Sequence, residues 1–140
     1  MGKNTNRTNG LRFETELCER LAAAGWWAHD MAQTAAGQPA DVIAARLNTP
    51  VLIDCKLCTG NNFRMSRVEP NQETAMELWT ALGNSHAYFA VKYPSGNIYM
   101  ISYEDYLLLK REQVHSIPEV AAVPRFRTFG RWLDRMEDLI

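Results

Sequence analysis

The sequence lacks a hydrophobic run long enough to cross a membrane, which takes about 20 residues, and its polar start, MGKNTNRTNG, has no apolar signal segment. We therefore expect a cytoplasmic protein with no membrane partner. Internal repeats, low-complexity tracts and linkers are also absent from the sequence. We expect one folded domain over residues 11–140, preceded by a flexible N-terminal arm at residues 1–10 that shows no apolar period.

Cysteine is scarce, because Cys18, Cys55 and Cys58 are the only three. They are too few for a disulfide framework and fit a reducing compartment. Cys55 and Cys58 form a C-x-x-C, but no second pair and no H-x-x-x-H accompany it, and a thioredoxin-type pair opens a helix rather than ending a strand. We expect packed thiols here instead of a zinc or redox site.

An excess of charge of one sign is also missing, since 15 Lys and Arg residues and 16 Asp and Glu residues give a net charge of -1. The whole chain therefore offers no general electrostatic attraction to nucleic acid. Basic residues do gather locally, and for each the alternative is a solvated side chain balanced by nearby acids. The five expected to contact phosphates are Lys3, Arg7, Arg12, Arg64 and Arg67.

What the sequence does contain is a charged hairpin over residues 39–56. Its two halves, residues 41–47 and 51–56, are rich in β-branched and aliphatic residues, and Asn48-Thr-Pro50 between them is typical of a turn. Two antiparallel strands are therefore the simplest interpretation.

Three charged residues of this hairpin are expected to converge. A two-residue turn that sets Leu47 against Pro50 pairs Ile43 with Asp54 and Asp41 with Lys56. Period-two alternation then places Asp41, Asp54 and Lys56 on one face. A bulge or an odd loop would change the pairing but would leave Asp54 and Lys56 on a shared face. Charges within an apolar strand are costly to bury unless they are paired or bind a metal. We interpret the group as a functional site; the alternative is a surface salt bridge on an edge strand.

A helix is predicted before the hairpin. Apolar residues recur at helical spacing over residues 11–22, and Gly25 is a typical stop. Glu14 lies beside the apolar stripe, so its carboxylate is expected to point toward the sheet. The alternative is a solvated Glu14, with Glu16 as the second candidate for the same role.

A second helix is predicted after the hairpin, with Pro70 in its first turn and Gly83 at its end. Gln72 lies one turn before the apolar stripe of residues 75–82 and on the same side. A glutamine on a buried face needs hydrogen-bond partners, so Gln72 is a candidate to support the site. The alternative is an ordinary N-terminal helix residue.

The remaining elements complete an α/β pattern. Strands are predicted at residues 26–31, 86–93 and 97–101, a capping box at Ser102-Tyr-Glu-Asp105 opens a helix, and a last short helix covers residues 130–139. We predict a single-domain α/β fold, a mixed β-sheet flanked by helices.

Two carboxylates beside a lysine suit a hard divalent cation and phosphodiester hydrolysis. Asp41, after Pro39-Ala, and Asp54-Cys-Lys56 thirteen residues later resemble the PD-(D/E)xK nuclease signature, with one residue added to the usual Pro-Asp pair and Asp in place of the commoner Glu. Gly10 with Glu14 resembles the G-x-x-x-E of Holliday junction resolvases in this superfamily. Residues 63–72 resemble the segment after the catalytic strand in RecU-type resolvases.

The resemblance spans roughly residues 10–101 and implies a restriction-endonuclease-like nuclease domain. It implies a homodimeric, structure-selective DNA endonuclease that uses Mg²⁺ or Mn²⁺, above all a Holliday junction resolvase acting on four-way junctions. It further implies Glu14, Asp41 and Asp54 as metal-site carboxylates, Lys56 as the catalytic lysine and Gln72 as a supporting catalytic residue.

Two other functions stay open at this point. A repair or restriction nuclease of the same superfamily would carry the same residues, and a DNA-binding module could keep the fold without catalysis. The intact set of Asp41, Asp54 and Lys56 favours an enzyme. The loop at residues 30–38 is short, whereas RecU-type enzymes carry a longer projecting stalk there and archaeal-type resolvases do not.

Overall fold

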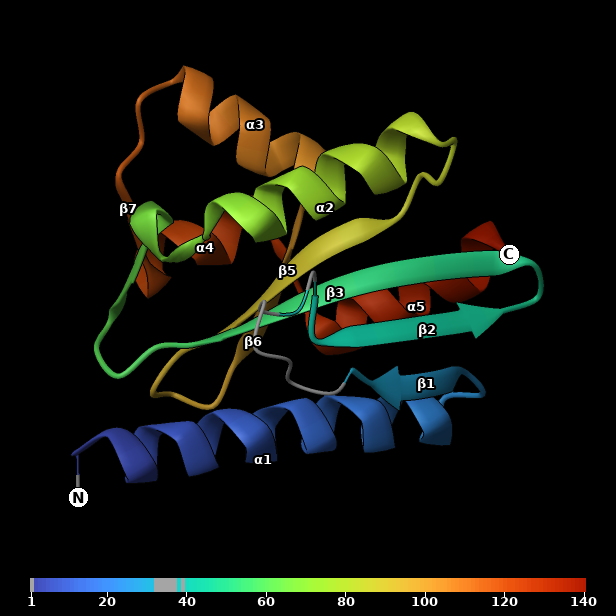
Figure 1. Ribbon diagram of the computed structural model, residues 1–140, viewed down its shortest axis with the longest axis horizontal. Helices are drawn as coiled ribbons and strands as arrows, with labels where there is room; N and C mark the ends of the chain where they lie inside the picture. The colour runs from blue at the N-terminus through green and yellow to red at the C-terminus, as the bar shows by residue number, and fades with distance from the viewer. Residues whose placement is uncertain (1, 32–37, 39) are drawn as a thin grey trace.

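The computed structural model describes the backbone at residues 2–31, 38 and 40–140, and the side chains within these ranges from residue 8 onward. A six-stranded sheet in the order β1-β2-β3-β5-β6-β8 is flanked by helices (Figure 1). The β3–β5 pair is parallel and the other neighbours are antiparallel. The predicted mixed sheet flanked by helices is confirmed.

The strands of the described ranges are β1 (Trp27–Asp30), β2 (Val42–Arg46), β3 (Thr49–Leu57), β4 (Asn62–Arg64), β5 (Ala87–Lys92), β6 (Ile98–Ser102), β7 (Ser116–Pro118) and β8 (Arg127–Thr128). The helices are α1 (Gly2–Ala23), α2 (Pro70–Ala81), α3 (Tyr103–Arg111), α4 (Glu119–Arg125) and α5 (Phe129–Leu139), with a short 3-10 helix, η1 (Met65–Arg67).

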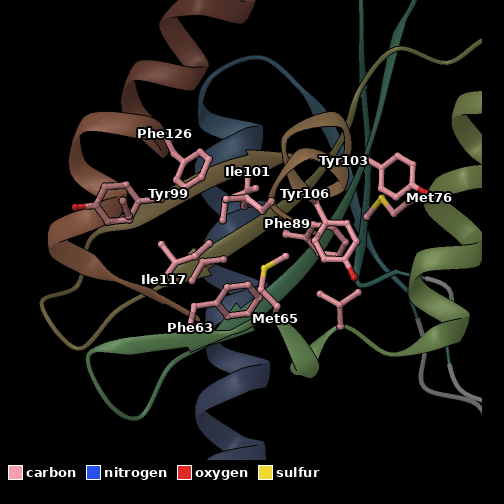
Figure 2. Packing of buried hydrophobic residues seen from close by; sticks show 14 of the residues in the cluster. Phe63, Met65, Met76, Phe89, Tyr99, Ile101, Tyr103, Tyr106, Ile117 and Phe126 are labelled. Carbon is pink, nitrogen blue, oxygen red and sulfur yellow. The ribbon is translucent and has the colours of Figure 1, made fainter. Parts of the chain in front are cut away.

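The sheet separates two hydrophobic clusters. One cluster, partly shown in Figure 2, joins α2, α3 and α4 to the sheet through residues such as Met76, Phe89 and Tyr106. The other packs α1 and α5 against the opposite face and includes Leu17 and Trp132. Strand β3 contributes to both clusters because its side chains alternate between the faces. The predicted alternation of β3 is therefore confirmed.

The hairpin register differs from the prediction by two residues. Leu47 and Asn48 form the turn with φ values of 48° and 66°, so Arg46 faces Thr49. The predicted turn would have required a positive φ at the β-branched Thr49, which is sterically unfavourable. Regular pairing ends at Val42 opposite Ile53, and the Asp41 N–H donates to the Ile53 carbonyl at 3.1 Å.

The predicted pairing of Asp41 with Lys56 and of Ile43 with Asp54 is consequently wrong. Ile43 lies opposite Leu52 instead, and Asp41 follows the last regular pair at the end of β2. Asp54 and Lys56 remain two residues apart on one strand, so they share a face in this register as in the predicted one.

Helix α1 begins at Gly2 rather than near residue 11. The division into an arm at residues 1–10 and a domain at 11–140 stays a prediction. Helix α4 was not predicted, because the prolines at 118 and 124 are unfavourable within a helix. Pro118 is the N-cap of α4, where a missing N–H does not matter. Pro124 lies one residue before the end of α4, so the helix is not continued far beyond the proline. Ser102 is the N-cap of α3, since its Oγ accepts from the Asp105 N–H at 3.0 Å, which is one of the two hydrogen bonds of the predicted capping box.

Within the described ranges, no helix combines the length and the apolar character that a membrane span requires.

Candidate active site

The site lies where β3 continues past the end of β2. Beyond Ile53, β3 keeps β5 as a neighbour but no longer pairs with β2. Asp41 occupies this edge, and its Oδ2 accepts a hydrogen bond from the Cys55 N–H at 2.7 Å. Its other oxygen, Oδ1, accepts from the side-chain amide of Gln38. Two donors therefore fix the Asp41 carboxylate.

Asp54 is fully buried in the same strand. Among the described residues, no donor meets the geometry of a hydrogen bond to either carboxylate oxygen, although Nζ of Lys56 lies 3.1 Å from Oδ2 as an ion pair. Burial raises the pKa of Asp54 well above its usual range; the Lys56 charge opposes this shift, and the nearby Asp41 adds to it. A carboxylate in this position is poorly neutralised and attracts a further cation.

Lys56 is held at a second point by α2. Its Nζ donates to Oε1 of Gln72 at 2.8 Å, and the same oxygen accepts from the Glu69 N–H at 2.9 Å. Glu69 and Gln72 form a capping box at the start of α2. Gln72 is therefore both an N-terminal residue of the helix and a partner of the site, since its side chain caps α2 and contacts Lys56.

Glu14 approaches the group from α1. Burial, the neighbouring Asp41 carboxyl and the charge of Asp30 raise the pKa of Glu14 to about 8. Glu14 points toward the sheet as predicted, while Glu16 instead forms an ion pair with Lys92 at 2.7 Å. The five predicted residues are thus linked by successive contacts, from Glu14 to Asp41 and Asp54, and from Asp54 through Lys56 to Gln72.

Two polar residues of this region were missed by the sequence analysis. Gln38 is buried, donates to Asp41, and accepts a hydrogen bond on its backbone carbonyl from Nδ2 of Asn71 at 3.2 Å. Asp30 ends β1 and accepts from the Cys18 thiol at 3.3 Å. A polar residue three positions before Asp41 was the only sequence signal for Gln38. Pro39 lies outside the described residues.

The donor set of this site fits a hard divalent cation. In the part of the chain that the structure describes, the two buried Asp54 oxygens accept no hydrogen bond of normal geometry. The nearby Asp41 charge further disfavours the ionised form of Asp54. Among the described residues, no group of three or more His, Cys, Asp or Glu side chains is arranged to hold a metal ion. Magnesium does not require such a group, because it binds one or two carboxylates and retains waters and substrate phosphate oxygens.

A groove of about 1220 Å³ runs alongside the group between α1 and the segment after β3, and Glu14 and Cys55 are among its lining residues. Three predicted phosphate contacts, all exposed, also line it: Arg12, Arg64 and Arg67. The side chains of Lys3 and Arg7 lie outside the part of the chain that the structure describes.

Comparison with protein families matches residues 5–128 to the family described as archaeal Holliday junction resolvase (Hjc). Among curated protein sequences, none matches the chain. The solved structure of Hjc from Archaeoglobus fulgidus, a Holliday junction resolvase from an archaeal hyperthermophile, is similar with a TM-score of 0.67 and 21% identity. The match covers 89% of this chain and 99% of that one. The likeness in structure bears on the fold, and it confirms the predicted single-domain fold class.

The metal-free protein is expected to lose stability as the pH rises from about 4.5 to about 8. The pKa of Glu14 is raised from 4.5 to about 8 in the folded state, so between these values the folded protein binds more protons than the unfolded chain. Raising the pH then favours unfolding. Urea unfolding in EDTA at pH 5, 6.5 and 8 measures the slope.

Glu14→Gln should flatten that slope, whereas Glu19→Gln, an exposed position on the same helix, should keep it. An unchanged slope in Glu14→Gln would contradict the shift.

Proposed function

Since the chain belongs to the archaeal Holliday junction resolvase family, we propose that Asp41, Asp54 and Lys56 form its catalytic centre, completed by Glu14 and Gln72. Family membership confirms the predicted activity: the protein is a Holliday junction resolvase, an endonuclease with the divalent-metal dependence of its family. The observation that carries the site assignment is the buried Asp54 carboxylate, whose nearest positive charge among the described residues is the Lys56 ammonium group at 3.1 Å.

Magnesium is the proposed cation, with manganese as a substitute, and Asp41, Asp54 and Glu14 are the residues that would hold it. Hard cations prefer carboxylate oxygens, and Mg²⁺ retains several waters. When bound, such an ion acts as a Lewis acid on the phosphodiester and lowers the pKa of a water. The unpaired Asp54 oxygens and the raised pKa values of Asp54 and Glu14 support this assignment.

The proposed role of Lys56 follows from its two contacts. Asp54 and Gln72 restrain its ammonium group at 3.1 Å and 2.8 Å, so its charge is in place before the substrate binds. A fixed positive charge stabilises the negative charge that develops on a phosphate during attack. The raised pKa of Glu14 in the metal-free protein means that binding of a cation there would release a proton.

The groove is the proposed path of the DNA backbone. Arg12, Arg64 and Arg67 line it together with Lys92, and Glu14 connects it to the catalytic group. Phosphate contacts of this kind position a substrate without reading its sequence. Lys3 and Arg7, earlier on α1, are proposed to extend the same contact.

Cleavage of a synthetic four-way junction with Mg²⁺ tests the centre. Asp54→Asn and Lys56→Ala are each expected to lower the rate by roughly 100-fold or more, because each removes a group that acts on the transition state. Asp138→Asn and Lys110→Ala, at exposed positions on α5 and α3, are the controls and should cut normally.

Activity that survives both Asp54→Asn and Lys56→Ala would refute the assignment. Linear duplex, flap and single-stranded DNA run in parallel should be cut more slowly than the junction.

The contribution of the groove arginines to DNA binding should appear in the salt dependence of the affinity. Arg64→Ala and Arg67→Ala are each expected to reduce the slope of log affinity against log salt by about 1, since each contact releases counterions. Fluorescence anisotropy of a labelled junction in EDTA, from low to moderate salt, measures the slope. Arg111→Ala, exposed on α3, should leave it unchanged; equal slopes in all variants would remove the groove from the binding path.

A homodimer acting on DNA in the cytoplasm completes the proposal. Two matched cuts in a junction require two sites, and a two-fold dimer supplies them. Exposed leucines provide apolar area that a second copy could cover; they are Leu78 on α2, Leu82 directly after α2, and Leu107 and Leu108 on α3.

Sedimentation equilibrium at micromolar concentration should give the mass of two chains. Leu82→Asp, at a position 74% exposed, should shift that mass toward one chain, while Val120→Asp on α4 should not. A monomer at every concentration would contradict the dimer.

A further inference from the structure

The terminal strand of the sheet, β1, carries an exposed aromatic pair. Trp27 is 62% exposed, and no other aromatic residue of the described ranges is among the exposed large hydrophobic residues. Its ring stacks on that of His29, with centroids 5.9 Å apart and planes inclined by 17°. Ala28 and Asp30, which alternate with them, are half-buried. The pair therefore presents exposed aromatic rings to solvent, and the contact with His29 restrains the Trp27 ring.

This surface lies on the same face of the sheet as Asp54. His29 lies opposite Ile43, and Ile43 lies opposite Leu52, so the three side chains share a face. Asp54 is two residues beyond Leu52 and shares that face as well. In Figure 1, α5 lies behind β2 and β3, while no described helix crosses the near side of β1 and β2.

The distance between the aromatic pair and Asp54 suits a DNA strand that runs from the catalytic group to the aromatic pair. His29 is two strands and two residues away from Asp54, which corresponds to about 12 Å between their Cα atoms. Stacked nucleotides of one strand rise by about 3.4 Å each. A base three or four steps from the cleaved phosphate is therefore within reach of the Trp27 and His29 rings.

The chemistry of the surface favours a base over a phosphate or a protein. The cross-strand neighbours of Trp27 and His29 are Ala45 and Ile43, which offer no positive charge to a phosphate. A stable interface between proteins needs about 800 Å² from each partner, more than two side chains and their small neighbours provide. An unpaired base matches the surface, because aromatic rings stack on any base without reading its sequence.

We propose that Trp27 and His29 form a stacking site for an unpaired base of the strand that is cut. This assignment rests on the proposed function and adds to it a subsite that recognises unpaired bases near the branch point. A continuous duplex keeps its bases stacked inside the helix, so the subsite would favour branched DNA over linear DNA.

The test compares Trp27→Ala with Trp27→Phe in binding to a four-way junction in EDTA, where cleavage is prevented. Removing a stacking partner is expected to weaken binding roughly 5- to 100-fold, while Trp27→Phe should stay close to the wild type. The salt slope should be the same in all three proteins, since no phosphate contact is lost. Val120→Ala, at a position 79% exposed on α4, is the matched control.

A direct readout places 2-aminopurine at each of the four nucleotides on either side of the cut. Its fluorescence should change on binding the wild type at one of these positions and not on binding Trp27→Ala. Circular dichroism and sedimentation of each variant establish that folding and mass are unchanged.

The outcomes separate the two proposals. If the wild type neither binds nor cuts junctions, the proposed function fails whatever Trp27→Ala does. If the wild type is active and Trp27→Ala binds equally well, the stacking site alone is refuted. A lower salt slope or a lower sedimentation mass in Trp27→Ala would also overturn it, because Trp27 would then act on a phosphate contact or between two copies of the chain.

Discussion

Burial of the Asp54 carboxylate in the middle of the sheet is the constraint on which the site depends. An ionised group in that position is costly unless positive charge or hydrogen-bond donors surround it, and within the described ranges no donor forms a hydrogen bond of normal geometry to its oxygens. Lys56 supplies one charge at 3.1 Å, while Asp41 brings a second negative group close by. The fold therefore leaves negative charge that is only partly neutralised, and a divalent cation is suited to balance it.

The beginning of α2 converts helix packing into site geometry. Asn71 donates to the backbone of Gln38, which in turn donates to Asp41, and the next residue, Gln72, receives the ammonium group of Lys56. One helical turn thus positions a residue from each side of the centre. Met76 of the same helix is fully buried. Its packing in the apolar core therefore sets the position of α2, and with it the positions of Asn71 and Gln72.

The sequence was informative wherever a local period or a short motif determined the outcome. The alternation of β3 placed Asp54 and Lys56 together, and the motif identified Asp41 and Glu14. The hairpin register could not be derived, because it depended on Leu47 accepting a positive φ. Gln38 escaped notice because its role depends on the path of a loop, which no periodicity encodes. The contact of a base with Trp27 likewise depends on strand order, since β1 had to be the edge strand.

Strand β3 is shared by two hydrophobic clusters, and this affects when the site can form during synthesis of the chain. Asp54 reaches its final surroundings only when α1 covers one face and α2, with β5 beside it, completes the other. Residues from position 14 to position 92 must be in place together, and the second cluster also draws on α5 at the end of the chain. A chain still emerging from the ribosome therefore has no assembled centre. The site that we propose for cutting DNA is therefore assembled only with the completed fold.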